Sequence, residues 1–374
     1  MEFVAARKDF ATALARAQGI PEQKNLSSVM ANVLLESVGE DQVRLTAMSY
    51  EVTLVTTFAA KVAVEGQMAL SGRSLFDAAR MLPDAPVSLK SLPNDWADLS
   101  AGRTQYRIPG VLSSNMPERQ DVNVTEHVAV PKDLLLEMGE RVAFAMSSDE
   151  GRPNLNGVFL RVEPAGKLTR LEMVATDGHR LSQLTRQVEQ AEISQPMSVI
   201  LHRKGVTELK RFLDNENGPV SLGFQRNAVV FKVETGYLKV RQIELDYPDY
   251  GRVIPSSFKW TFVVDRADLT RAVQRASVVI SGDKTPIVRL LLDSKRIQIV
   301  AQDPEKGEAH TEIDVEYSGD KLEISYNNRY LLDAVNALPG QQVVFSVKDL
   351  SSATRLTSPV DEGTAQLIMP ISRV

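Results

Sequence analysis

The chain has 374 residues, a length that suits two or three domains. Hydrophobic residues make up 43% of it, enough to build several cores, which excludes a wholly disordered protein. The absence of cysteine excludes disulfides, a thiolate nucleophile and a cysteine-ligated metal. A net charge of −5 gives no general signal for nucleic acid, so such a role must depend on local charge.

The N-terminal sequence "MEFVAARKDF" lacks the apolar segment of a secretion signal. No run approaches the roughly 18 apolar residues of a membrane span. The expected location is therefore the cytoplasm.

The first third of the chain predicts a helix, strands, a second helix and further strands. In "RKDFATALARAQ" (7–18), Asp9 is followed by Phe10 and, four residues later, by Leu14. That spacing predicts one buried helical stripe, and the acid suits the positive end of the helix dipole. Alternating hydrophobicity predicts strands within 32–47 and 87–108, and 71–84 predicts the second helix.

The middle third repeats this order. Asp133, Leu134 and Met138 reproduce the first helical pattern within 131–143. Strands are predicted within 156–175 and 220–240, and a helix within 201–215.

The last third repeats the order again. Asp268, Leu269 and Val273 mark a helix within 265–277, and 327–340 predicts the second helix. Strands are predicted within 287–301 and 343–356. One arginine lies near the start of each second helix, at Arg73, Arg203 and Arg329.

The chain is therefore interpreted as three copies of about 125 residues, an α+β fold in which each copy packs two helices on antiparallel sheets. The linkers fall near 117–128 and 249–260, which predicts domains over 1–122, 128–252 and 258–374. The alternative is a single α+β enzyme whose internal similarity is accidental.

Positive charge is concentrated on the predicted helices. Together they carry a net charge of +6, which leaves −11 for the rest of the chain, counted over 7–18, 71–82, 131–143, 202–213, 265–277 and 327–338. If the helices share one surface, that surface attracts phosphate. The alternative, a plain helical preference for Lys and Arg, explains the split poorly because helices favour Glu equally.

One turn of the middle copy differs from its counterparts. The copies align on one alanine, at Ala47, Ala175 and Ala301. In "VATDGHRLS" (174–182) this alignment places His179 opposite Glu51 and Glu305, so the fold does not require a histidine. The middle copy is predicted to have adapted this turn for a function.

Three interpretations of this turn remain open. Catalysis by Asp177 and His179 would need a Ser, Thr or Lys poised beside the histidine, and the sequence identifies none. His179 could instead be a structural histidine, or the turn could form a ligand or peptide site around Arg180 and Leu181. Neither a phosphate-binding loop nor a spacing of histidines typical of metal sites occurs, so no cofactor and no metal are expected.

At "ATDGHRL" the chain resembles the bacterial β sliding clamps, the DNA polymerase III β subunit family. The resemblance covers the whole length and includes "RPNLNGV" (152–158), "RKGV" (203–206), "YPDYGRVIP" (247–255), "VEYSGD" (315–320) and Met369-Pro370. It implies a homodimeric ring of six domains, without catalytic activity, that encircles duplex DNA and confers processivity. The partners implied are the polymerase catalytic subunit, the clamp loader and other replication and repair proteins, which places the protein at the nucleoid.

The resemblance also implies three sets of site residues. A pocket for peptides with glutamine and apolar anchors would comprise Leu155, Thr176, Gly178, His179, Arg180, Leu181, Pro248, Arg252, Val253, Leu367 and Met369. DNA contacts would involve Lys24, Arg73, Arg203 and Lys204. The dimer interface would bring Arg103, Tyr106, Arg107 and Ile108 of one chain to Val279, Ile280, Glu305 and Glu308 of the other.

Two departures from the family pattern bear on these expectations. Ser27-Ser28 replace an apolar-proline stretch, and the C-terminal "MPISRV" is longer than the common ending, which affects the expected pocket lining. The rival functions are an enzyme using Asp177 and His179, and a clamp-like binding module that never encircles DNA.

Overall fold

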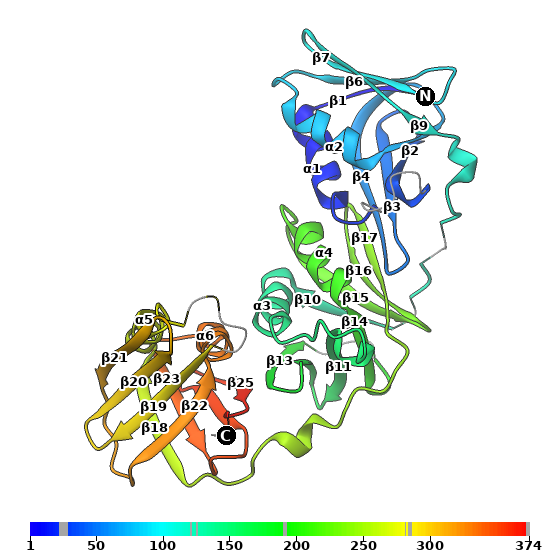
Figure 1. The fold of residues 1–374 in the computed structure, drawn as a ribbon. Coiled ribbons are helices and arrows are strands. Elements are labelled where there is room, and N and C mark those ends of the chain that lie inside the picture. The colour runs from blue at the N-terminus through cyan, green and yellow to red at the C-terminus, as the bar shows by residue number, and fades with distance from the viewer. Residues whose placement is uncertain are drawn as a thin grey trace. The chain divides into compact units, whose positions relative to one another are not determined.

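The computed structural model describes residues 1–21, 29–119, 122–124, 126–189, 193–280, 282 and 286–371. Along the described chain one order of elements occurs three times (Figure 1). In each copy a strand leads into a helix, four strands follow, and a second helix leads into three more strands. The first copy adds a short fourth strand, β9 (Gly110–Val111). The repeat predicted from the sequence is therefore present in the fold.

All six predicted helices are confirmed, with bounds α1 (Arg7–Ala17), α2 (Gly72–Met81), α3 (Lys132–Ala143), α4 (Arg203–Leu213), α5 (Arg266–Ala276) and α6 (Asn328–Ala337). Side chains just before four of them accept backbone N–H groups and so begin the helix. Ser71 accepts from Ser74, His202 from Lys204, Asp265 from Asp268, and Asn327 from both Arg329 and Tyr330.

The predicted helical stripes are buried with one exception. Phe10 and Leu14 of α1, and Leu269 and Val273 of α5, lie in the core. In α3, Leu134 is only half-buried, and the next residue, Leu135, is buried in its place, together with Met138. The prediction for Leu134 was therefore wrong by one position, because the run of three leucines offers several apolar faces.

The described chain forms two compact units, and the first comprises Met1–Leu136, Gly166–Leu168 and Val188–Glu244. Its main sheet has the order β10-β15-β16-β17-β4-β1-β6-β7-β8, and α1 lies beside α2 (Figure 1). The strands of the unit are β1 (Glu2–Ala5), β2 (Asn32–Val38), β3 (Gln42–Met48), β4 (Val52–Val64), β5 (Gln67–Ser71), β6 (Val87–Ser91), β7 (Ala97–Ala101), β8 (Thr104–Ile108), β9 (Gly110–Val111), β10 (His127–Pro131), β14 (Met197–His202), β15 (Pro219–Gln225), β16 (Ala228–Val233) and β17 (Gly236–Arg241).

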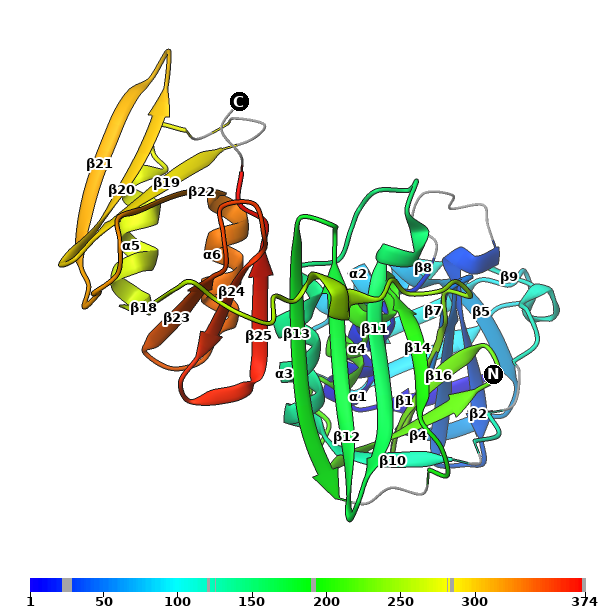
Figure 2. The same ribbon diagram turned by 90° about the horizontal axis from the view of Figure 1, so that it is seen from below.

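The second unit comprises Glu137–Ala165, Thr169–Gln187 and Leu245–Val374. One sheet runs β11-β12-β13-β25-β24-β23-β18, and a separate sheet runs β21-β20-β19-β22 (Figure 2). The strands are β11 (Gly157–Ala165), β12 (Leu168–Thr176), β13 (Arg180–Glu189), β18 (Trp260–Asp265), β19 (Ile287–Asp293), β20 (Arg296–Asp303), β21 (Gly307–Asp314), β22 (Leu322–Asn327), β23 (Gln342–Val347), β24 (Thr354–Ser358) and β25 (Asp361–Ile368).

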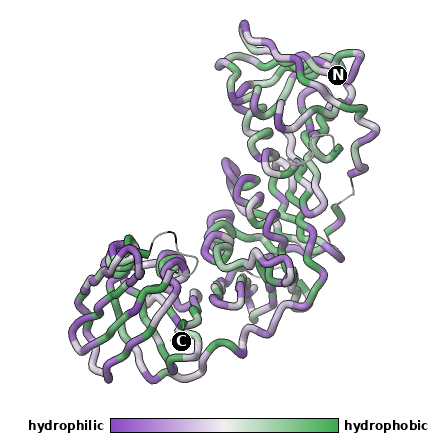
Figure 3. Tube along the Cα trace, viewed as in Figure 1, coloured by the Kyte–Doolittle hydropathy of each residue, from purple (hydrophilic) through white to green (hydrophobic). Residues whose placement is uncertain are grey.

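The middle copy is divided between the units because its outer strands pair with neighbouring copies. β17 pairs antiparallel with β4 of the first copy, and β13 pairs antiparallel with β25 of the third. Hydrophobic and hydrophilic residues are interspersed along the chain (Figure 3). Burial alternates along strands such as β7 and β23, as is typical of half-buried antiparallel sheets. Among the described residues, none of the helices is long and apolar enough to cross a membrane.

Candidate functional site

The turn between β12 and β13 is held by side chains that bind its own backbone. Asp177 Oδ1 accepts the N–H groups of His179 at 2.9 Å and of Arg180 at 3.1 Å. Thr176 Oγ1 accepts the N–H of Gly178 at 3.1 Å. Gly178 has φ +89°, a conformation that favours glycine. The geometry of the turn therefore accounts for "TDG" without catalysis.

Asp177 does not orient the His179 ring. Its second oxygen, Oδ2, accepts a hydrogen bond from Arg180 Nε at 3.0 Å. The exposed His179 ring stacks on Tyr330, with 6.4 Å between ring centroids and 22° between planes. This arrangement lacks the acid-to-imidazole hydrogen bond that activates a nucleophilic triad.

Arg180 fastens the turn to two helical segments. Its Nη1 bonds to Asp333 Oδ2 of α6 at 2.5 Å, and its Nη2 donates to the carbonyl of Phe144, just after α3, at 2.8 Å. The guanidinium also lies 4.3 Å from the centre of the Tyr330 ring. The position of the turn is therefore fixed by a half-buried arginine whose donors are satisfied on several sides.

A cavity of about 250 Å³ opens beside this turn, wholly within the second unit. Ten of the eleven residues predicted for a peptide pocket line it, namely Leu155, Thr176, Gly178, His179, Arg180, Leu181, Pro248, Val253, Leu367 and Met369. Arg252 is absent from this lining, and its exposed side chain pairs with Asp249 at 2.9 Å.

Three further residues line the cavity, namely Asp249, Tyr250 and Ala353. The first two lie inside the motif "YPDYGRVIP", so the motif could have indicated them. Ala353 directly precedes β24, and it is brought to the cavity because β24 pairs with β25. Nothing in its local sequence marks this position.

The floor of the cavity is an apolar cluster. Leu181 and Leu367 are paired across β13 and β25, and both are buried. The Tyr250 hydroxyl donates to Glu172 Oε2 at 2.9 Å, and burial together with the Glu172 charge raises the pKa of Tyr250 above its usual value. At the rim, Val253 and Met369 remain 52% and 38% exposed. A concave apolar floor with a polar turn at its edge suits the apolar side chain of a bound segment.

The four residues expected to contact DNA differ in their environment. Lys24 lies outside the described residues. Arg73 is exposed at the start of α2 and lies 3.8 Å from Asp77. Arg203 begins α4 and is half-buried. Lys204 Nζ donates to the carbonyl of Ile20 at 2.9 Å, so this lysine also ties α4 to the segment after α1.

Most residues expected at the dimer interface lie on an edge strand or in the turn before it, whereas Val279 and Ile280 follow α5. β8 ends the main sheet of the first unit, and β21 ends the separate sheet of the second. Ile108 and Ile280 are only 3% and 2% exposed, so they offer little surface to another chain. Tyr106 and Val279 are half-buried, and Val278 is 70% exposed.

The charged members of the interface set remain accessible. Arg103 and Glu305 are exposed. Arg107 pairs with Asp98 at 3.1 Å, and Glu308 lies 3.1 Å from His310.

Among the residues that the structure describes, no group of three or more His, Asp or Glu is placed to hold a metal ion.

Comparison with known proteins identifies the fold. The N-terminal, central and C-terminal domain families of the DNA polymerase III beta subunit match residues 1–119, 129–249 and 251–372. The beta sliding clamp of Caulobacter vibrioides is 30% identical over 99% of this chain and 100% of its own length. The beta sliding clamp of Pseudomonas aeruginosa is 29% identical over the same shares.

Solved structures agree. A Caulobacter crescentus beta sliding clamp has a TM-score of 0.93 and 29% identity, covering 100% of this chain and 99% of that one. The Pseudomonas aeruginosa DNA polymerase III subunit beta has a TM-score of 0.90 and 29% identity, covering 100% of both chains.

Three α+β domains with six helices on antiparallel sheets define this protein as a DNA clamp. The chain belongs to the DNA polymerase III beta subunit family, the bacterial sliding clamps. Its function is that of a processivity clamp for the replicative polymerase, and the family is non-catalytic.

Proposed function

We propose that two copies of the chain, each with domains over 1–122, 128–252 and 258–374, close head to tail into a ring around duplex DNA. The edge strands β8 and β21 support this arrangement. Arg103 and Arg107 lie at the first edge, and Glu305 and Glu308 at the second. Opposite charges on two unpaired strand edges favour their association, and pairing protects both edges from aggregation.

The helices would supply the surface that faces DNA. The net charge of +6 over the predicted helical segments contrasts with −11 elsewhere. Diffuse charge attracts phosphates without reading base edges, so the ring could move along any sequence. Arg73, Arg203 and Lys204 are the candidates for direct contact among the described helices, and Lys24 would add to them.

The cavity of the second unit would bind short peptides from partner proteins at the nucleoid. The observation that best supports this proposal is the apolar floor formed by Leu181 and Leu367, next to the partly exposed Met369. Methionine adapts to different apolar anchors, so several partners could share the site. The polar turn at the edge of the cavity would bind the glutamine side chain. The partners would be the polymerase catalytic subunit, the clamp loader and repair proteins with such peptides.

The test is titration of a labelled peptide with glutamine and apolar anchors into the wild type and Met369→Ala. Truncating Met369 removes part of an apolar contact, so affinity should fall about tenfold. Met81→Ala is the matched control, because Met81 is 74% exposed on α2 and does not line the cavity. Equal affinities in all three proteins would refute this site.

A further inference from the structure

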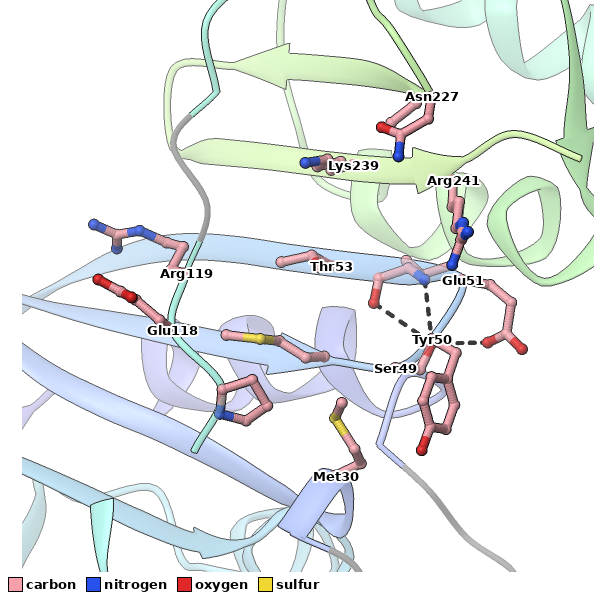
Figure 4. A pocket seen from close by; sticks show the side chains of 14 residues that line it. Met30, Ser49, Tyr50, Glu51, Thr53, Glu118, Arg119, Asn227, Lys239 and Arg241 are labelled. Carbon is pink, nitrogen blue, oxygen red and sulfur yellow. Dashed lines mark hydrogen bonds between the residues drawn. The ribbon is translucent and has the colours of Figure 1, made fainter. Parts of the chain in front are cut away.

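The first unit holds a second cavity, of about 350 Å³. Figure 4 shows its walls. They comprise the end of β3, the following turn and the start of β4 (48–53), the segment 117–119, Met30, and residues of β16 and β17 with the preceding Asn227. Those described residues belong to strands, turns and connecting segments rather than to α1 to α6.

Backbone geometry makes this cavity the counterpart of the cavity in the second unit. Thr53 pairs with Lys239 between β4 and β17, as Leu181 pairs with Leu367 between β13 and β25. The N–H of Arg241 donates to the carbonyl of Glu51 at 2.8 Å. The N–H of Met369 donates to the carbonyl of His179 at the same distance, 2.8 Å. The two cavities therefore occupy the same place in consecutive copies of the fold.

The floors of the two cavities differ in chemistry. The second unit has Leu181, Leu367 and Met369 where the first unit has Thr53, Lys239 and Arg241. Lys239 and Arg241 are two residues apart on β17, so their side chains leave the same face of the strand. An apolar floor has thus been replaced by one with two adjacent cations.

The charges around this floor leave the cavity positive. Lys239, Arg241 and Arg119 line it together with Glu51 and Glu118 (Figure 4). Glu51 accepts a hydrogen bond from the Ser49 hydroxyl at 3.0 Å. Its carboxylate also lies 3.9 Å from the Nζ of Lys204, a residue that does not line the cavity.

The two arginines have acidic neighbours outside the lining. Arg119 lies 3.7 Å from Glu36, and Arg241 lies 3.7 Å from Glu244. The Arg241 pair is well exposed, and exposed pairs of this kind are weak. Burial lowers the pKa of Lys239, so an anionic partner would stabilise its charged form.

Apolar surface adjoins the cations. Tyr50, at the tip of the turn, is 74% exposed, and Met30 and Met48 also line the cavity. A ligand that fills the cavity would therefore combine a negative group with an apolar or aromatic one.

We propose that this cavity binds a short acidic segment of a partner protein, in which an Asp or Glu lies beside an apolar or aromatic residue. The carboxylate would bind Lys239 and Arg241, and the apolar side chain would pack on Met30 and Tyr50. An acidic peptide is favoured over DNA because the lining is separate from the helices that carry the excess positive charge. The proposal does not depend on peptide binding in the second unit.

The test uses the full chain with isotope-labelled methionine methyl groups observed by NMR. The probe is the acetylated peptide Glu-Phe-Glu-Leu-Glu, and its matched control is Gln-Phe-Gln-Leu-Gln. The acidic peptide should shift the Met30 and Met48 resonances saturably, and the neutral peptide should not. The Met369 resonance reports separately on the second unit.

The variant Lys239→Leu/Arg241→Met places the second unit's residues in the first cavity. It should lower the affinity for the acidic peptide by at least about tenfold, which is the effect of losing one charge-assisted hydrogen bond. Lys232→Leu, an exposed lysine of β16 outside the lining, should bind as the wild type does. Equal shifts with both peptides, or unchanged affinity in the double variant, would overturn the proposal. So would a short single-stranded oligonucleotide that shifts the same two resonances more strongly, because the ligand would then be phosphate.

Discussion

Gly178 is needed for the backbone of the turn and for the shape of the cavity beside it. At φ +89° an added Cβ is strained, and it would also lie 2.8 Å from Arg152 Nη1, the flexible end of a side chain. Gly166 has a similar φ of +67°, but an added Cβ would meet nothing within 4 Å. The two positions therefore separate backbone strain from the effect on the cavity.

We expect Gly178→Ala and Gly166→Ala each to lower the free energy of unfolding by about 1 kcal/mol, measured by urea denaturation. Only Gly178→Ala should weaken binding of the glutamine peptide, because of the two glycines only Gly178 lines the cavity. If Gly166→Ala lowered the affinity for the peptide equally, the loss would reflect general destabilisation.

His179 and Arg180 are adjacent, but truncating them should affect the free energy of unfolding to very different extents. His179 is exposed, so His179→Ala should change stability by no more than about 0.5 kcal/mol and should still support processive synthesis. Arg180→Ala should cost about 2–4 kcal/mol, because it leaves Asp177 and Asp333 without their partner. Loss of processive synthesis in a well-folded His179→Ala protein would contradict this expectation and would show that the imidazole contributes to partner binding in the cavity that it lines.

At the scale of elements, Asp361 joins α3, β13 and β25. It accepts hydrogen bonds from Arg186 at 2.7 and 3.0 Å and from Arg141 at 3.1 Å. Burial opposes ionisation of Asp361, but the bonds from Arg186 and Thr364 outweigh it and hold the pKa below the usual range. The stabilisation is therefore complete above the unfolded pKa of about 3.9 and is lost as pH falls through the lower folded value.

Asp361→Asn should accordingly reduce the free energy of unfolding by about 1–3 kcal/mol at pH 7. The difference from the wild type should begin to shrink below about pH 4, because the carboxyl of the unfolded wild type then binds a proton, and it should vanish once the pH passes the lower folded pKa. Glu362→Gln removes the same charge from the exposed neighbouring residue and should have little effect. A difference that stayed constant down to pH 2 would contradict this account.

The elements that repeat three times could be predicted from the sequence, because period and capping residues are local properties. The half-burial of Leu134 could not, because three consecutive leucines do not specify which one faces the core. Ala353 was also beyond prediction, since its place depends on strand pairing between distant segments. Nine of the ten predicted residues that line the cavity lie in family motifs, and Leu367 was implied by the resemblance over the whole length. The counterpart cavity became visible only from matching strand registers.

At the scale of the whole molecule, a clamp must remain closed on DNA and yet open for loading. Charged pairs at strand edges suit this requirement, because each exposed pair contributes only about 0–1 kcal/mol and is weakened by salt. Ile108 and Ile280 are buried within their own domains, so the apolar surface offered by these segments comes from Tyr106, Val278 and Val279. The dimer should therefore dissociate more readily as the salt concentration rises.

A charge exchange tests the proposed contact directly. Arg103→Glu would place two acids opposite each other at both interfaces of the ring, so sedimentation velocity at micromolar concentration should show a shift from dimer to monomer. Glu305→Arg alone should do the same. The two substitutions in one chain should restore the dimer, because position 103 of each copy would again face an opposite charge on its partner. The control Lys348→Glu changes an exposed residue that belongs to neither β8 nor β21, and it should remain dimeric. A double variant that folds but stays monomeric would show that these residues do not meet, and a dimeric Arg103→Glu protein would place the contact elsewhere.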